Sequence, residues 1–227
     1  MSRRSTAPSQ VLARSVAELP RGTLAQLRSQ ARRCRACPLW AHATQTVFGE
    51  GPADATLMLL GEQPGTQEDL SGRPFVGPAG GLLDRALEEA GLERAGLYLT
   101  NTVKHFKYEP RGKLRLHKRA NAAEQQACRQ WLAAEVASLR PRLIVAMGSM
   151  AAQALFGAAF KVTRERGKLR HLGDGTTEGL ATWHPSAVLR APGPGRVRLY
   201  QELVADLRVA QQRSRALRTL PAASPAA

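Results

Sequence analysis

Four side chains that commonly bind metals are spread along the 227-residue chain. Cys34 and Cys37 form a C-x2-C pair, while His105 and Cys128 stand alone later in the sequence. Three cysteines cannot form a complete set of disulfides, and in an intracellular chain this spacing more often indicates a metal site. The four side chains could hold a tetrahedral zinc ion or an iron–sulfur cluster, and the spacing alone does not separate the two.

A second group of chemically useful residues lies in the segment GEQPGTQEDLSGRPFVGPAGG, residues 61–81. Its glycines and prolines predict a loop in which backbone N–H groups can approach a ligand closely. GPAGG opens a helix, whose N-terminus suits a phosphate or an anionic ring. Phe75 either plugs one end of the core or stacks on a nucleobase. The acidic and amide side chains of this segment offer acid, base and hydrogen-bonding groups: Glu62, Gln63, Glu68 and Asp69.

Two histidines lie in segments that could reach a ligand. His117 belongs to KHFKYEPRGKLRLHKR (104–119), where Arg115 and Lys118 are close neighbours. A histidine in such a segment contacts phosphate or is simply exposed, and its basic neighbours also lower its pKa and keep it neutral and nucleophilic. His184 precedes Pro185 in WHPSAVLR and is either a packed residue or a rigid hydrogen-bond donor.

Leu189 and Arg190 close that second motif. They could act as a wedge and a phosphate contact on DNA whose target nucleotide is flipped out, or merely begin the next segment. The net charge of +15 favours a polyanionic partner, since basic patches displace counterions from nucleic acid. Most of this charge lies in residues 1–35 and 102–120, which predicts a nucleic-acid interface at the second segment. An Arg-rich but merely solvated surface is the alternative for the first.

Apolar runs alternate with helical patterns along the chain. Strands are expected at 56–60, 97–101, 143–148 and 180–186, and helices at 22–33, 78–91, 121–139, 149–156 and about 196–212. Asn121 and Glu124 form a capping box at the start of the long helix. Residues 104–120 read as a loop, and 166–170 as extended. This alternation predicts an α/β fold with a buried parallel sheet, whose ligands bind beyond the carboxyl ends of the strands.

The domain organisation follows from composition. Residues 1–21 are expected to form a basic flexible tail, 22–212 one domain, and 213–227 a disordered tail. No apolar stretch follows the charged N-terminus, and no run of about 18 apolar residues occurs, so neither a secretory signal nor a membrane span is expected. We expect a cytoplasmic monomer, associated with the nucleoid through DNA.

Four motifs in order resemble the uracil-DNA glycosylase superfamily, over roughly residues 25–212. GEQPG, PFVGPAGG, LYLTN and WHPS match the family 4 enzymes, which contain an iron–sulfur cluster. His105 stands where family 4 usually has Cys, and KLRLHK is similar to the basic loop of X-type enzymes, whose histidine bonds covalently to the DNA sugar. Gln63 also fits the X type, whereas Thr66 stands where an Asp often occurs.

The resemblance implies a three-layer αβα sandwich with a central four-stranded parallel sheet, and a [4Fe–4S] cluster. It assigns cluster binding to Cys34, Cys37, His105 and Cys128. It assigns catalysis to His117, Glu62, Gln63 and His184, with His117 as the nucleophile that captures the sugar. Uracil binding falls to Phe75, Asn101 and Gly61, and DNA binding to Arg115, Lys118, Ser186 and Arg190.

The implied partner is uracil-containing DNA, single- or double-stranded. Two other functions stay open from the sequence. One is a conventional family 4 enzyme that releases free abasic DNA with multiple turnovers, in which His117 only contacts phosphate. The other is a non-catalytic iron–sulfur module that binds DNA or a replication partner.

Overall fold

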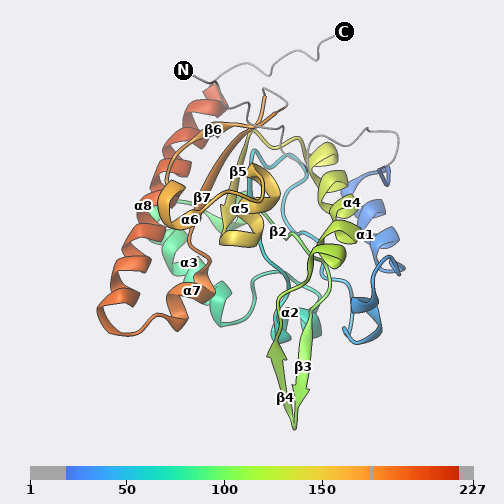
Figure 1. Cartoon of the computed structure of the whole chain (residues 1–227). Helices are drawn as coiled ribbons and strands as arrows, with labels where there is room; N and C mark the ends of the chain where they lie inside the picture. The colour runs from blue at the N-terminus through green and yellow to red at the C-terminus, as the bar shows by residue number, and fades with distance from the viewer. Residues whose placement is uncertain (1–18, 174–175, 220–227) are drawn as a thin grey trace.

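The computed structural model describes residues 19–173 and 176–219, and most of the expected N-terminal tail and residues 220–227 lie outside this part (Figure 1). A five-stranded sheet has the order β2-β1-β5-β7-β6. Four strands are parallel: β1 (Leu57–Gly61), β2 (Tyr98–Asn101), β5 (Leu143–Met147) and β7 (Glu178–Thr182). The expected parallel sheet is therefore confirmed. The two-residue strand β6 (Arg170–His171) extends it, antiparallel to β7.

Helices cover both faces of the sheet, which makes the expected three-layer sandwich. Leu57 and Leu59 pack on the side of α3 (Pro78–Ala90), α7 (Pro185–Arg190) and α8 (Gly193–Thr219). Met58 and Leu60 pack on the other side, with α4 (Ala122–Leu139) and α5 (Ser149–Phe156). All five residues of β1 are buried, as apolar runs in parallel sheets require.

The remaining helices are short. Helix α1 (Leu24–Ala31) packs against α4 on the right of Figure 1, while α6 (Val162–Glu165) contacts β7. Two 3-10 turns span Pro38–Ala41 and Arg94–Gly96. The capping box at Asn121 is confirmed: its side chain accepts the Glu124 N–H at 2.9 Å, and the Glu124 carboxylate accepts the Asn121 N–H at 2.7 Å. No helix among the described residues is long and apolar enough to cross a membrane.

Three sequence-based expectations were wrong. The segment 104–120 is not a loop but carries a β-hairpin of β3 (Tyr108–Arg111) and β4 (Leu114–His117), which projects from the body in Figure 1. Pro110 fits because each strand of a two-stranded hairpin has an outward side that needs no N–H donor. Helix α2 (Thr66–Ser71) interrupts the loop expected at 61–81. Residues 213–219 continue α8 and are not a disordered tail.

A buried ion pair lies where β2 meets α4. The Lys104 ammonium contacts a Glu135 carboxylate oxygen, and both side chains are completely shielded from solvent. Lys104 Nζ also donates to the Thr100 hydroxyl at 2.7 Å and to the Asn101 carbonyl at 2.8 Å. Glu135 in turn accepts the Gly49 N–H at 2.9 Å. The network is satisfied on both sides, and so it locks strand, helix and preceding loop together.

This pair generates a stability prediction. Glu135→Leu leaves the Lys104 ammonium buried without its counter-charge, and we expect a loss of about 3–5 kcal/mol in unfolding free energy. The double variant Lys104→Met/Glu135→Leu removes both charges and should recover most of that loss. Urea unfolding followed by far-UV circular dichroism measures both. A single variant as stable as the parent protein would contradict the assignment.

Candidate active site

The carboxyl ends of β1 and β2 place two predicted site residues side by side. Gly61 and Asn101 are register partners at the last position of these strands. The motif with His184 follows β7 at the same edge of the parallel sheet. Predicted site residues from three strands therefore lie at the same edge of the sheet.

Gly61, Phe75 and Asn101 pack tightly against one another at this edge. A Cβ atom added to Gly61 would lie 2.3 Å from Asn101 Oδ1 and 2.5 Å from Phe75 Cζ. Any side chain at position 61 would therefore displace the other two residues. Asn101 is 3% exposed, and its Oδ1 has no hydrogen-bond partner among the described residues. A buried amide oxygen without a donor is costly, and this one is suited to accept a hydrogen bond from a planar ligand.

The backbone around Phe75 is held in an unusual conformation. Its φ of 56° lies in the left-handed region that non-glycine residues rarely adopt. A guanidinium nitrogen of Arg94 donates to the Phe75 carbonyl at 3.1 Å. Gly80 lets that carbonyl approach α3, since a Cβ there would lie 2.0 Å from it. Phe75 is thus fixed with its ring 6.2 Å from the ring of His184, centroid to centroid.

His184 has a defined ring orientation. Its Nδ1 accepts the Ser186 backbone N–H at 3.1 Å and lies 2.7 Å from the Ser186 hydroxyl. Because Nδ1 is an acceptor, the proton of the neutral ring resides on Nε2, which can donate to a ligand. Burial, reinforced by Arg190 and His117, lowers the pKa of His184 to about 4. The ring is therefore a neutral donor at pH 7.

His117 is the last residue of β4 and pairs with Tyr108 across the hairpin. The residue is exposed, and its ring lies 6.1 Å from Phe106, which stacks on Tyr108 at 5.1 Å. Partial desolvation of the ring lowers the pKa of His117, while Glu62 opposes the shift and Arg190 adds to it. The imidazole is thus largely neutral at pH 7, and Glu62 and Arg190 are close enough to act on it.

Gln63 fastens the hairpin at its base. Its Nε2 donates to the carbonyls of Lys107, at 3.2 Å, and Lys118, at 3.0 Å. Its Oε1 accepts the Ala120 N–H at 3.2 Å. Gln63 is 7% exposed and binds both chains of the hairpin beyond its two strands. The loop that follows β1 is thereby tied to the segment that carries His117.

The basic residues predicted to bind DNA differ in their surroundings. Arg115 pairs with buried Asp69 at 2.8 Å and lies over the Tyr108 ring, so its guanidinium already has structural partners. Lys118 is exposed and pairs with Glu109 across the hairpin. Arg190 is exposed at the end of α7.

Glu68 is not an available acid or base. Its carboxylate accepts the N–H groups of Gly65, Val76 and Gly77 at 2.8–3.1 Å. Asp69 similarly accepts the Thr44 N–H at 2.9 Å besides its pairing with Arg115. Both carboxylates therefore order the loop. Glu62 remains the acidic side chain beside His117.

The three cysteines belong to one apolar cluster. Cys128 is buried in it, Cys34 and Cys37 pack against it, and all three are free thiols. Burial, opposed by Lys104 and aided by Cys34 and Cys37, raises the pKa of Cys128 to about 12. Cys128 Sγ also accepts the Lys104 N–H at 3.2 Å. Within residues 19–173 and 176–219, no three Cys, His, Asp or Glu side chains form a recognisable single-ion site.

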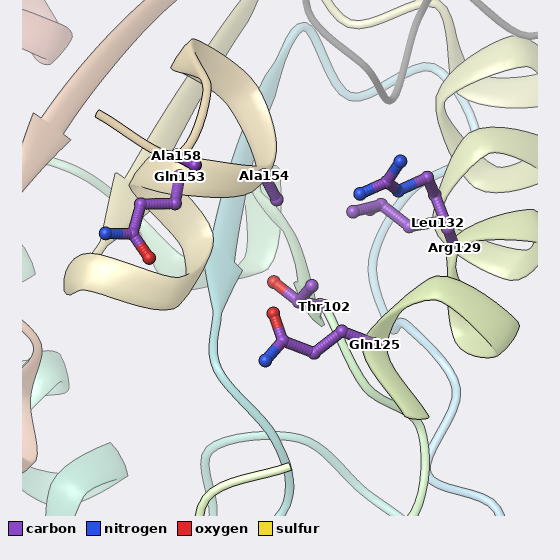
Figure 2. A pocket seen from close by; sticks show the side chains of 7 residues that line it. All are labelled: Thr102, Gln125, Arg129, Leu132, Gln153, Ala154 and Ala158. Atoms are coloured by element: carbon purple, nitrogen blue, oxygen red, sulfur yellow. The ribbon is translucent and has the colours of Figure 1, made fainter. Parts of the chain in front are cut away.

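A separate cavity of about 130 Å³ lies between α4 and α5. Figure 2 shows Gln153 and Ala154 on one side, Arg129 and Leu132 on the other, and Thr102 between them. None of the residues predicted to bind uracil lines it. Thr102, which lines this cavity, donates its hydroxyl hydrogen to the Gly61 carbonyl at 2.9 Å, so the cavity lies near the end of β1 without including the predicted uracil-binding side chains.

Two residues with site contacts were not expected from the sequence. Lys104 anchors the Asn101 carbonyl and the Cys128 sulfur, and its position at the start of a basic segment gives no sign that its side chain is buried. Thr46 binds His105 Nε2 at 3.0 Å, and nothing in its sequence surroundings marks it.

Comparison with known proteins identifies the family. Residues 48–208 match the model of the uracil DNA glycosylase superfamily. The chain is 37% identical to a type-4 uracil-DNA glycosylase of Thermotoga maritima, over 70% of this chain and 79% of the relative. It is 34% identical to the type-4 uracil-DNA glycosylase of Pyrobaculum aerophilum, over 74% and 86%. The chain belongs to the uracil-DNA glycosylase superfamily.

The state of His184 is directly testable. We expect nitrogen NMR to show a neutral ring protonated on Nε2 at pH 7, with a titration midpoint near 4. The unfolded chain binds this proton near pH 6.5 and the folded chain does not, so His184 makes stability fall as pH decreases from 6.5 to 4. A midpoint near 6.5 would contradict the assignment. Ser186→Ala keeps the backbone N–H and should keep the tautomer.

Proposed function

We propose that this protein excises uracil from DNA and that His117 then bonds covalently to the exposed sugar. The observation that carries the first part is the unpaired, buried Asn101 Oδ1 near Phe75, whose ring lies 6.2 Å from the ring of a neutral His184. A flipped uracil ring offers its N3–H to the Asn101 oxygen, its face to Phe75 and its O2 to His184. The names of the relatives support the same activity.

Uracil binding uses Phe75 and Asn101 at the strand ends. The base stacks on Phe75, and Asn101 pairs with its N3–H and O4. Gly61 lets these two side chains keep their positions, because a larger residue would displace both. Arg190 and Lys118 bind backbone phosphates beside them. Arg115 orders the hairpin through its ion pair with Asp69, and the guanidinium nitrogens that do not contact Asp69 are presented to the DNA strand.

Bond cleavage leaves its electron pair on the base. The C1′–N1 bond breaks and uracil departs as an anion, while the sugar acquires oxocarbenium character. Nε2–H of His184 donates to O2 and stabilises the developing charge, as a fixed donor does in an oxyanion hole. The lowered pKa of His184 keeps the ring neutral at pH 7, so it acts as a hydrogen-bond donor and not as an imidazolium acid.

Capture uses the hairpin. A lone pair on a ring nitrogen of neutral His117 forms a bond to C1′, and the imidazolium proton passes to solvent or to the uracil anion. Glu62 lies near enough to stabilise the positive charge on the ring. Gln63 holds the hairpin root. Glu62 is engaged by the ring, and none of the other proposed site residues supplies a second general base to hydrolyse the adduct, so the protein acts in a single turnover.

The cysteine cluster and His105 support a [4Fe–4S] cluster. The donor set fits: three free thiols are grouped in an apolar environment, and a backbone N–H already donates to Cys128 Sγ. Cluster ligands bind different iron atoms and need not converge on one point. Cys34, Cys37, Cys128 and His105 would hold it, and it would supply a covalent brace between the N-terminal segment, α4 and the hairpin root.

The covalent step is tested by mixing the protein with a uracil-containing oligonucleotide. We expect a slowly migrating species on a denaturing gel that survives heating. His117→Ser should abolish this species and release abasic DNA, whereas His171→Ser, at an exposed histidine on β6, should not alter it. Uracil release with turnover and no adduct in the parent protein would favour the conventional glycosylase. DNA binding without uracil release would favour the non-catalytic module.

The role of Gln63 gives a second prediction. Gln63→Leu leaves two carbonyls and one N–H at the hairpin root without their partner, which loosens the segment carrying His117. We expect adduct formation to slow about tenfold, which corresponds to roughly 1.4 kcal/mol, with a smaller change in uracil release. Gln67→Leu, at an exposed position of α2, is the matched control. Equal slowing of both steps would contradict a role specific to capture.

A further inference from the structure

The chain of contacts around Thr46 links two residues that are far apart in the sequence. The Thr46 hydroxyl lies 3.0 Å from the Ala31 carbonyl and 3.0 Å from His105 Nε2. The same Ala31 carbonyl accepts the Cys34 N–H at 3.0 Å. Backbone pairing fixes the arrangement, since the Val47 N–H donates to the Lys104 carbonyl at 2.8 Å.

The direction of each hydrogen bond follows from the groups involved. A carbonyl only accepts, so the single hydrogen of the Thr46 hydroxyl goes to Ala31. The hydroxyl oxygen can then only accept from His105, whose Nε2 must carry the ring proton. A neutral imidazole has one N–H, and so Nδ1 of His105 keeps its lone pair.

We infer that Thr46 is a positioning residue that makes His105 a cluster ligand through Nδ1. This inference rests on the proposed cluster and goes beyond its ligand set. An imidazole ligand is commonly oriented by a partner that binds its other nitrogen, and such partners determine tautomer and affinity. Here the Thr46 hydroxyl also donates to the Ala31 carbonyl, which accepts the Cys34 N–H as well. The Cys34 N–H keeps its bond to Ala31 without Thr46, so the orienting effect of the hydroxyl falls on His105.

Histidine and cysteine at position 105 should respond differently to the loss of the Thr46 hydroxyl. A cysteine thiolate binds iron through its sulfur and has no ring nitrogen for Thr46 to orient, so Thr46 matters only where the ligand is histidine. If Thr46 merely packed α1 against its neighbours, its removal would have the same consequence with either residue at position 105. This difference separates positioning from general support of the fold.

The test uses the full chain purified without oxygen. Iron, sulfide and the visible absorbance band measure the cluster, and its loss to a chelator is timed. We expect Thr46→Ser to behave as the parent, because it keeps the hydroxyl, and Thr46→Val to lose the cluster about tenfold faster. In a His105→Cys background, Thr46→Val should change the rate less than about twofold. Equal acceleration in both backgrounds, or none in either, would overturn the inference.

A second measurement does not depend on the folding of any variant. Pulsed electron paramagnetic resonance of the reduced parent protein, made with histidine labelled with ¹⁵N at Nδ1 alone, reports the nitrogen bound to iron. Coupling to the labelled nitrogen supports the inference, and coupling only to Nε2 overturns it. A parent protein without iron and sulfide refutes the proposed cluster itself, whereas a cluster that is indifferent to Thr46→Val refutes only the role of Thr46.

Discussion

The buried pair of Lys104 and Glu135 is the constraint on which the site depends. Neither charge reaches solvent, so each must keep its partners, and those partners belong to different layers of the fold. Lys104 holds the carbonyl of Asn101 through its ammonium group and the sulfur of Cys128 through its backbone N–H. The residue proposed to read the base and a proposed cluster ligand are therefore fixed by the same lysine. His105 follows it directly in the chain, and the hairpin begins three residues after His105.

The proposed reaction uses two parts of the structure, a rigid group of side chains at the strand ends and a hairpin outside the main sheet. Phe75, Asn101 and His184 are held at the strand ends by a left-handed backbone, a buried network and a fixed tautomer. His117 instead lies on a two-stranded hairpin outside the main sheet, fastened at its root by Gln63. Base recognition requires a preformed pocket, whereas capture requires a nucleophile that meets the sugar once the base has left. The two needs are assigned to different elements of one fold.

The sequence predicted the parallel sheet and most of the helices and strands because apolar runs and the Asn121 cap are local signals. The β-hairpin was missed because Pro110 and the density of charge favour a loop, and the pairing of Tyr108 with His117 is a contact across the turn. The grouping of Gly61, Asn101 and His184 at one edge follows from the rule that ligands bind at strand ends, whereas the position of Phe75 beside His184 is known only from the structure. The ion pair of Arg115 with Asp69 and the contact of Thr46 with His105 join distant segments, and no local pattern encodes them. The ion pair with Asp69 means that Arg115 is not a free cation but also orders the hairpin.

Covalent capture by His117 is the central claim, and intact mass spectrometry of the reaction with a uracil-containing oligonucleotide tests it most directly. Because the bond to uracil is exchanged for a bond to imidazole, the product should have the summed mass of protein and oligonucleotide less one uracil. Digestion should place the sugar–phosphate remnant on the peptide that contains His117. Unmodified protein together with free abasic oligonucleotide, or a remnant on a peptide without His117, would contradict the account.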